Sequence, residues 1–598
     1  MEKVRRISMV LSVSGLFALI VAMGVAMAAP TAGTLTVDQS VGGCVSSAGQ
    51  SDPYGVVYCG VSYAVIDAAD GDTVSISGHS YNETLWISGQ EITLAGAGEG
   101  VTVLDGAGLG QRVVWLANGS VVTITGMTIQ NGQEANVNGG GGILSEHSDL
   151  TLIDVTLFNN SATSAEGGGL KNRYGTVVLS HTTVASNTAS TNGGGLAVSS
   201  TGASLTLINS TVISNVSLTG AGGAIYAGRP LTMIDSDVIS NTAQTGGGGI
   251  YVYLTTATLT GVTIQDNAVI EADKRGGGIY NSGTVHMSGG TIALNRSIQY
   301  GGGIYSPSGS HTTLTDVTIE GNSSGTGGGI YAVSDDMQVT GCTIQSNQAT
   351  AGGGIRNHGT ITVTASTILS NTATSSGGGV SNYSGTMIVE DSDFIGNQAE
   401  GSLGGGIYNR ATMVIARSSL ERNKVNTAGG LGGGIHIVSG GVMTMTETAV
   451  FSNTAAESGG GVYNDGTAWI DASAIYWNTT GVEGSGIKND ASGDLWVTNT
   501  TVSGNRTYGN GGGIENRGDL VLTNCTLTEN VADFDDNGTG DGGGFAAGPS
   551  SGGSAAFRNT IVAENHDEGK EYPDCVHTGG SITSNEHNLV LMLSLIHI

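Results

Sequence analysis

The sequence predicts an all-β chain folded as a single right-handed parallel β-helix, a solenoid of about 16–18 coils with an N-terminal cap. Three observations support this fold class: two sequence markers that recur in step, short period-2 alternation between them, and an unusual composition. The chain has 102 Gly, 6 Pro and only 12% charged residues, and this bias extends from residue 110 to residue 565. Gly enrichment without Pro excludes collagen, and regularly spaced Ile, Val and Leu exclude a disordered tract.

The first marker is an apolar residue that follows Gly-Gly-Gly or a close variant, at intervals of 25 to 31 residues. It recurs at Ile143, Leu170, Leu196, Ile225, Ile250, Ile279, Ile304, Ile330, Ile355, Val380, Ile407, Ile435, Val462, Ile487, Ile514 and Phe545. The second marker is an Asn that follows an apolar residue and two variable residues. It recurs at Asn160, Asn187, Asn215, Asn241, Asn267, Asn295, Asn322, Asn347, Asn371, Asn397, Asn423, Asn453, Asn478, Asn505, Asn530 and Asn565. Two independent markers with one period identify an internal repeat.

Each repeat unit has the pattern of short strands. Residues 205–215 alternate apolar residues with Thr or Ser, which is typical of half-buried β-strands. Such a unit cannot bury its apolar face alone, so successive units must stack in parallel, about 4.8 Å apart. Sixteen marked coils would then span roughly 72 Å. The glycines are expected to supply turns with positive φ and close approach between coils, and the Asn column to form a ladder of stacked amides.

Two stretches match the repeat motifs of chlamydial polymorphic outer-membrane proteins: Gly222-Gly-Ala-Ile225 and Phe394-Ile-Gly-Asn397. Elsewhere the motifs relax to Gly-Gly-Gly-Ile and Ile/Val/Leu-x-x-Asn. The region from about residue 110 to 565 resembles the wider group of right-handed β-helix repeat proteins in the pectate-lyase-like superfamily. The resemblance implies a cap and first coils in residues 29–110, with a short amphipathic helix at 62–69, ahead of the repetitive helix at 111–565.

Both ends of the chain carry separate predictions. Residues 1–28 are predicted to be a signal peptide, because basic residues precede an apolar run and a small-x-small site ends at Ala28. The alternative is an uncleaved anchor. No later segment is expected to span a membrane, so the protein would be extracellular or exposed on a bacterial cell surface. Residues 566–592 resemble the start of a longer C-terminal segment. The last six residues, 593–598, resemble a translated adapter sequence and are expected not to be native.

The acidic charge restricts the partners. The formal net charge is −29, and the first 28 residues contribute +2, which leaves −31 for the remainder. Such a surface repels phosphate backbones, so nucleic acid is not an expected partner. The expected partner is a polysaccharide or a surface protein.

The chain has five cysteines in a segment predicted to enter an oxidising compartment. Cys44 and Cys59 are close in sequence and are predicted to form a disulfide that closes a loop. Cys342 and Cys525 are expected to be buried small side chains within repeat strands. Cys575 has no obvious partner in the sequence.

Two aromatic columns are the main candidates for ligand binding. The residue after the marker should face solvent, and in five consecutive coils it is Tyr226, Tyr251, Tyr280, Tyr305 and Tyr331, with Tyr408 and Tyr463 further on. Five stacked phenols would form a stripe of roughly 19 Å. Trp469 and Trp496 occupy one strand position on neighbouring coils, with Trp477 nearby. Aromatic faces with polar edges suit sugar rings or a protein partner, and the alternative is that the rings only stabilise adjacent coils.

One loop has the spacing of a calcium site, Asp533-x-Asp535-x-Asn537-Gly, followed by Asp541. The bidentate Glu that usually closes such a loop is replaced by Gly544, so an acidic, solvated insertion is the alternative. Any calcium here would be structural, and no cofactor is required. We assign no catalytic residue, since Asp335-Asp336 and His358 have no matching partner set.

The sequence favours a non-catalytic secreted or cell-surface protein that presents a long β-helical face for adhesion or glycan binding. The alternative is a polysaccharide lyase or glycoside hydrolase that acts on acidic polysaccharide, with its site in an irregular coil between residues 470 and 545. A purely structural surface-layer role has the same sequence features as the first hypothesis.

Overall fold

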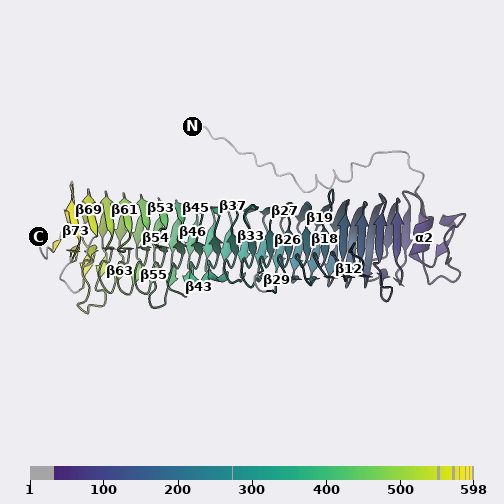
Figure 1. Cartoon of the computed structure of the whole chain (residues 1–598), viewed down its shortest axis with the longest axis horizontal. Helices are drawn as coiled ribbons and strands as arrows, with labels where there is room; N and C mark the ends of the chain where they lie inside the picture. The colour runs from purple at the N-terminus through teal and green to yellow at the C-terminus, as the bar shows by residue number, and fades with distance from the viewer. Residues whose placement is uncertain are drawn as a thin grey trace, which may run out of the picture.

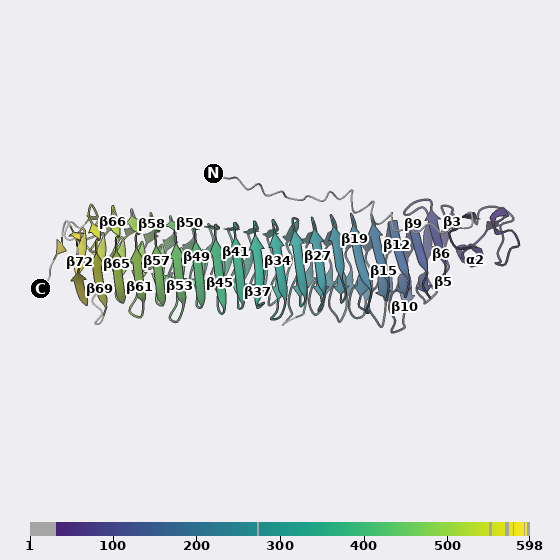
Figure 2. The same cartoon turned by 90° about the horizontal axis from the view of Figure 1, so that it is seen from above.

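The computed structural model describes residues 32–271, 274–548, 553–568, 573–577, 579–585, 587–590 and 593–594. They form one right-handed parallel β-solenoid of about 18 turns, which confirms the predicted fold class. Figure 1 shows a single elongated body, with helix α2 (Val61–Asp67) at one end and strand β73 (Ser581–Ser584) near the other. In Figure 2 the strands lie side by side across the long axis.

A representative coil contains four short strands. They are β36 (Ile330–Ala332), β37 (Asp336–Thr340), β38 (Thr343–Gln345) and β39 (Gln348–Ala351). Strands of the β37 and β38 types belong to one large sheet that bends at the corner between them, and strands of the β39 type within the described residues form two smaller sheets, of six and nine strands. Strands of the β36 type, most of which follow a glycine run, form a ladder that we call the marker sheet.

The predicted marker residues form a continuous apolar column in the core. Parallel pairing places the marker residue of each coil beside that of the next. Six successive members are at most 1% exposed: Ile225, Ile250, Ile279, Ile304, Ile330 and Ile355. Burying each such side chain contributes about 1.5–3 kcal/mol, and the gain is repeated in every coil. Stacking therefore supplies the core that a single unit lacks.

The glycine run is required by geometry at two of its positions. Gly247 has φ of +57°, in the left-handed region that side chains disfavour. At Gly248 a Cβ would lie 2.4 Å from the carbonyl oxygen of Gly277 in the next coil. The first glycine thus makes the turn, and the second permits close contact between coils.

The asparagine column forms the predicted ladder of buried amides. Asn322 donates from its backbone N and from Nδ2 to Oδ1 of Asn347, at 2.9 and 3.0 Å. Asn347 donates in turn to Oδ1 of Asn371 at 3.0 Å and to the carbonyl of Ile319 at 2.9 Å. Because each amide bonds to the coil before it and to the coil after it, the ladder holds the corners in register.

The residue before the ladder Asn adopts the left-handed conformation, which the sequence did not predict. Ser346 and Ser370 have φ of 54° and 52°, and Leu294 and Trp477 each have φ of 54°. A left-handed residue other than Gly costs about 1–3 kcal/mol and persists where the surroundings determine it. Here the ladder hydrogen bonds on the following residue fix the turn.

The N-terminal cap has the predicted short helix. β1 (Thr34–Val37) pairs in parallel with β2 (Val57–Tyr58) and β3 (Thr73–Ile76), and α2 buries Val61, Ala64 and Val65. The Glu83 carboxylate accepts the backbone N–H groups of Val61 and Ser62 at 2.7 and 2.9 Å, which caps the helix N-terminus.

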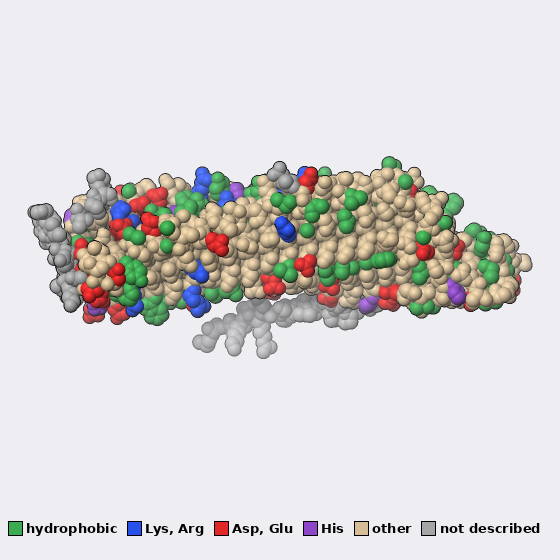
Figure 3. All heavy atoms as spheres, turned by 90° about the horizontal axis from the view of Figure 1, so that it is seen from below, with side chains coloured by type: hydrophobic (Ala, Val, Ile, Leu, Met, Phe, Trp, Pro, Cys, Tyr) green, Lys and Arg blue, Asp and Glu red, His purple; other side chains and the backbone are tan. Residues whose placement is uncertain are grey.

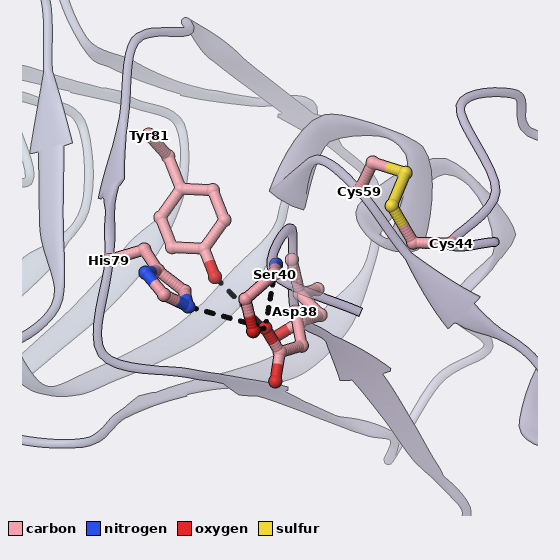
Figure 4. The surroundings of a disulfide bond; sticks show 7 residues. Asp38, Ser40, Cys44, Cys59, His79 and Tyr81 are labelled. Atoms are coloured by element: carbon pink, nitrogen blue, oxygen red, sulfur yellow. Dashed lines mark hydrogen bonds and ion pairs between the residues drawn. A yellow bond between two sulfur atoms is a disulfide. The ribbon is translucent and has the colours of Figure 1, made fainter. Parts of the chain in front are cut away.

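Cys44 and Cys59 are joined by a disulfide, with their Cα atoms 5.1 Å apart. Figure 4 shows it near the turn in which Asp38 accepts a hydrogen bond from the Ser40 backbone at 2.9 Å. Cys342 and Cys525 are buried, as expected. They stand at the corner ahead of β38 and of β66 (Thr526–Thr528), not within a strand as expected.

The predicted signal peptide lies outside the described residues, as do residues 595–598 of the suspected non-native tail. Across the ranges that the structure describes, none of the helices has the length and apolar character needed to cross a membrane.

Candidate functional site

The five tyrosines of the first aromatic column lie in register on the marker sheet. They are carried by β22 (Ile225–Ala227), β26 (Ile250–Val252), β30 (Ile279–Asn281), β33 (Ile304–Ser306) and β36. Parallel pairing places each tyrosine directly beside the next. Each one points out of the core because it follows an inward-pointing marker residue.

The phenol rings form one stack. Successive ring centroids from Tyr226 to Tyr331 are 5.6, 4.6, 5.0 and 5.6 Å apart. Contacts at these separations are worth about 0.5–1.5 kcal/mol per pair beyond area burial. The stack therefore stabilises the contact between neighbouring coils, even without a ligand.

The expectation that all five tyrosines face solvent is wrong for Tyr305, which is only 3% exposed. Arg275 covers this ring: its guanidinium carbon lies 4.9 Å from the Tyr305 centroid, and its Nη1 donates to the phenol oxygen at 2.6 Å. Tyr300 packs beside the same ring, with the centroids 6.3 Å apart. The other four tyrosines are partly exposed, because the turn ahead of each glycine run forms a low wall beside the column.

A cavity of about 450 Å³ opens between this wall and the column. The rings of Tyr226, Tyr251, Tyr253 and Tyr280 line it, together with Asn192, Ala221, Thr245, Lys274 and Arg275. We call this cavity the tyrosine groove. Its floor is aromatic and its rim carries two cations and an amide, a combination that can stack a flat ring and hydrogen-bond its substituents.

Arg275 gives the groove positive charge. Among the described residues, no carboxylate lies within ion-pair distance of its guanidinium, whereas Lys274 lies 4.0 Å from Glu271. The Arg275 side chain is held in place by stacking on Tyr300 and Tyr305 and by the hydrogen bond to Tyr305. A guanidinium that is fixed beside an open cavity, and that pairs with no described carboxylate, is suited to a carboxylate or sulfate group of a ligand.

Burial raises the pKa of the phenols in the column. Desolvation raises the pKa of Tyr251 and of Tyr305 to about 12, and it also raises the pKa of Tyr226, Tyr280 and Tyr331. All five phenols are thus protonated at neutral pH. They can donate hydrogen bonds, but they are poor proton acceptors.

Beyond Tyr331 the same column changes character. Its next members in register are Arg356, Ser381, Tyr408, His436 and Tyr463. The sequence prediction that Tyr408 and Tyr463 continue the column is confirmed. His436 separates them and is 4% exposed, so this part of the column is mostly closed.

Lys488 and Glu515 end the column in a buried ionic cluster. Lys488 is 2% exposed and pairs with Glu483 at 2.6 Å and with Glu515. Arg517 donates from Nε to Glu515 at 3.0 Å. Two cations and two carboxylates neutralise one another, so the cluster serves as a paired structural contact.

The second predicted aromatic pair is also in place. Trp469 and Trp496 lie side by side on β57 (Thr467–Asp471) and β61 (Asp494–Thr498), with centroids 5.2 Å apart and planes 9° apart. They are 42% and 36% exposed. Trp477 stands at a left-handed corner, 62% exposed, with its ring edge-on to Tyr476 at 5.1 Å.

The loop with calcium-site spacing is held by its own hydrogen bonds. Asp533 is buried, and its carboxylate accepts the backbone N–H groups of Asn537 and Gly538 at 3.0 and 2.9 Å. Asp535 accepts from Nδ2 of Asn537 at 2.8 Å. Within the ranges described, no three His, Cys, Asp or Glu side chains are grouped so as to hold a metal ion. Calcium binding by Asp533, Asp535, Asn537 and Asp541 stays a prediction.

Charge is unevenly distributed along the molecule. Figure 3 shows acidic side chains gathered toward the C-terminal end, while the middle coils present mainly uncharged polar surface on that face. The tyrosine groove belongs to these middle coils, so the acidic cluster at the C-terminal end in this view lies away from it. Distant charges are screened over about 8 Å at physiological salt.

Sequence reasoning missed Arg275 and Lys274, because they lie in a turn of variable length that carries no repeat signal. It also missed Trp86 and Trp115, which pair in register on β5 (Leu85–Ser88) and β8 (Val114–Ala117). Their spacing of 29 residues falls within the repeat interval and could have revealed them.

One similar solved structure is that of an alginate lyase of the PL6 family, AlyGC, in a mutant form. It shares 10% identity and covers 88% of this chain and 98% of its own, with a TM-score of 0.25, values too low to support any argument about function. A search of the curated proteins gives no match. The resemblance to the chlamydial polymorphic proteins stays a prediction.

The family model described as the right-handed beta helix region matches residues 82–292, 231–399 and 302–468. Together these ranges extend from residue 82 to residue 468, which is more than half of the chain. The chain belongs to the right-handed beta helix family.

Proposed function

We propose that this protein is a secreted or cell-surface β-helix protein that binds acidic polysaccharide in the tyrosine groove without cleaving it. The observation that carries the proposal is the guanidinium of Arg275, which pairs with no carboxylate in the described part of the chain, beside the open faces of the tyrosine stack. The rings offer flat apolar contact to sugar rings, and Arg275 and Lys274 offer partners for uronate carboxylates or sulfate esters.

The geometry favours a polymer over a single sugar. Ring centroids repeat every 4.6–5.6 Å along the column, so successive units of an extended glycan chain can meet successive rings. The contacts are individually small, but a chain that meets several of them gains avidity.

The chemistry favours binding over catalysis. Lytic cleavage of a uronate needs a base that removes a proton from the sugar ring. Tyr226, Tyr251 and Tyr280, which line the groove, have a raised pKa and keep their protons at neutral pH. They are suited to donating hydrogen bonds to sugar oxygens.

The experiment uses the purified chain against alginate, polygalacturonate and hyaluronate, with dextran as a neutral polymer. Affinity electrophoresis and calorimetry would measure binding, and ultraviolet absorbance and reducing-end assays would follow cleavage. We expect retention by at least one acidic polymer, weakened by added salt, without new chain ends. Cleavage would replace this proposal with the lyase or hydrolase alternative, and equal retention by dextran would contradict the role of Arg275.

Two substitutions locate the binding surface. Tyr251→Ala removes a central ring and should weaken binding about tenfold, which corresponds to about 1.4 kcal/mol. Arg275→Gln should weaken it by at least as much and reduce its salt dependence, since a charge-assisted bond is worth about 1.5–3 kcal/mol. Tyr174→Ala and Arg417→Gln are matched controls on other surfaces. Unchanged affinity in both groove variants would show that the polymer binds elsewhere.

The tryptophan pair provides a second surface to compare. If Trp469 and Trp496 contribute to polymer binding, Trp469→Ala should lower the affinity of long chains more than that of short oligosaccharides. If the variant binds long chains and short oligosaccharides as tightly as the parent chain does, this pair is only a structural contact between coils.

A further inference from the structure

A separate cavity lies at the N-terminal end of the marker sheet. Its volume is about 470 Å³, and it lies between the first coils of the solenoid and the turn at residues 134–138. Trp86 and Trp115 form one wall. Both occupy the same strand position as the tyrosines. Four strand-to-strand steps separate Trp115 from Tyr226, which corresponds to roughly 19 Å along the axis.

The two indoles are exposed to solvent. Trp86 is 64% exposed and Trp115 is 37% exposed. Their centroids are 6.0 Å apart with planes inclined by 30°, so the two rings are tilted and are not stacked face to face. A wide indole face exposed at this level is ready to pack against an apolar face of a ligand.

A buried ion pair forms the base of the cavity. Arg112 and Glu134 are joined at 2.6 Å, with side chains only 9% and 7% exposed, and Nε of Arg112 donates to the same carboxylate at 2.9 Å. The guanidinium carbon also lies 5.4 Å from the Trp115 centroid, which fixes the orientation of that indole. Since Glu134 compensates Arg112, the base of this cavity is neutral, in contrast to the tyrosine groove.

The rim supplies hydrogen-bonding groups without net charge. Gln111 and Asn136 line the opening and are exposed, so their amides are available as donors and acceptors. The Asn136 backbone N–H is held by Oε1 of Glu134 at 2.7 Å, which ties this side of the rim to the ion pair.

We infer that this cavity is a second saccharide site, which takes a neutral hexose or pentose unit stacked on Trp86 and Trp115. The indoles pack against the apolar face of the sugar ring, and the amides hydrogen-bond its hydroxyls. An acidic sugar is disfavoured, because Arg112, the one cation among the described lining residues, is paired with Glu134, and a carboxylate would lose its hydration without a partner. This inference does not depend on the tyrosine groove, because the residues, the ligand and the predicted salt dependence differ.

Calorimetry of the full chain with neutral cello-, xylo-, manno- and galacto-oligosaccharides tests the inference. We expect one series to bind, with an affinity that is insensitive to salt. Trp86→Ala should weaken this binding at least tenfold, and Trp115→Ala should do the same. Phe158→Ala removes an exposed aromatic ring from another sheet face, and it should bind as the unsubstituted chain does.

Circular dichroism would first show that each variant is folded, and Trp86→Phe serves as the milder substitution. Partial retention of affinity in Trp86→Phe supports stacking of a sugar on this ring. Absence of binding to every neutral series would overturn the inference, and so would undiminished binding by both tryptophan-to-alanine variants. Because these ligands are uncharged, a negative result would not bear on the proposed binding of acidic polymers, which is tested separately.

Discussion

At the scale of single residues, the position that follows each marker residue has different roles in different coils. It holds exposed indoles in the first coils, a phenol stack in the middle and a buried ionic cluster near the end. The sequence predicted the tyrosines, because they follow a marker with a fixed spacing. It could not predict that Arg275 covers Tyr305, since that contact depends on how a turn of variable length folds back.

His436 provides a pH-dependent test of this column. Burial lowers its pKa to about 4, and its Nδ1 has no hydrogen-bond partner among the described residues. An unfolded histidine titrates near 6.5, so between about pH 6.5 and pH 4 the unfolded chain binds more protons than the folded chain. Stability from this residue is therefore present above pH 6.5 and is lost as the pH falls toward 4.

His436→Phe should remove that loss while it preserves ring packing against Tyr463, whose centroid lies 4.9 Å away. Between pH 7 and pH 4.5 the unfolding free energy should fall by about 2.5 kcal/mol less in the variant than in the parent chain. Denaturant titrations at the two pH values would measure this difference. His286→Gln, at an exposed position, should behave as the parent does, and an identical pH response in His436→Phe would refute the assignment.

At the scale of elements, the strands and corners were the most predictable part of the fold. Period-2 alternation predicted the strands, and the spacing of the Asn residues predicted the ladder, because both patterns repeat in every coil. The left-handed residue ahead of each ladder Asn was not predictable, since Ser, Asp, Leu, Trp and Gly all occupy that position. What fixes it is the hydrogen bonding of its neighbour.

Trp477 shows a use of that corner. Its ring extends over the equivalent corner of the next coil, where a Cβ at Gly504 would lie 2.6 Å from the indole Cδ1. A glycine in one coil thus makes room for an aromatic residue in the previous one. The spacing of markers could not reveal this pairing, because the two residues differ in type.

The ladder itself yields a stability prediction. Asn347→Ala leaves two donors of Asn322 and the Ile319 carbonyl without their partners in a buried corner. Each unsatisfied buried group costs about 1–3 kcal/mol, so a loss of about 3 kcal/mol or more is expected. Chemical denaturation would measure it. Asn426→Ala, at an exposed position outside the ladder, should change stability by less than about 0.5 kcal/mol.

A small loss in Asn347→Ala would show that water or a relaxed turn replaces the amide. The comparison is informative because both variants remove the same side chain. Only the burial and the partners of that side chain differ.

At the scale of the whole molecule, stability is distributed among coils that contact only their neighbours. Removing residues 356–380 joins Ile355 to Ser381 and preserves the order of every strand type, because Ile355 pairs with Val380 in register. We expect this shortened chain to fold, to lose about 4.8 Å of length and to keep the tyrosine groove intact.

Circular dichroism and small-angle scattering would check fold and length, and the polysaccharide assay would check the groove. Removing only residues 368–379 is the matched control, because it takes out half a coil and misaligns the strands that follow. A half-coil deletion that folds as well as the whole-coil deletion would argue against independent stacking.

The structural unit of this fold, one coil, can also be duplicated as a unit in evolution. A coil of 25 residues, such as the one that begins at Ile330, is one continuous run of the sequence. In-frame duplication of such a run would lengthen the body by one layer and leave every older contact as it was. Duplicating the coil that carries Tyr251 would add a ring to the stack in a single mutational event. Copy number would then set the length of the aromatic stack, before any new side chain had to arise by point mutation.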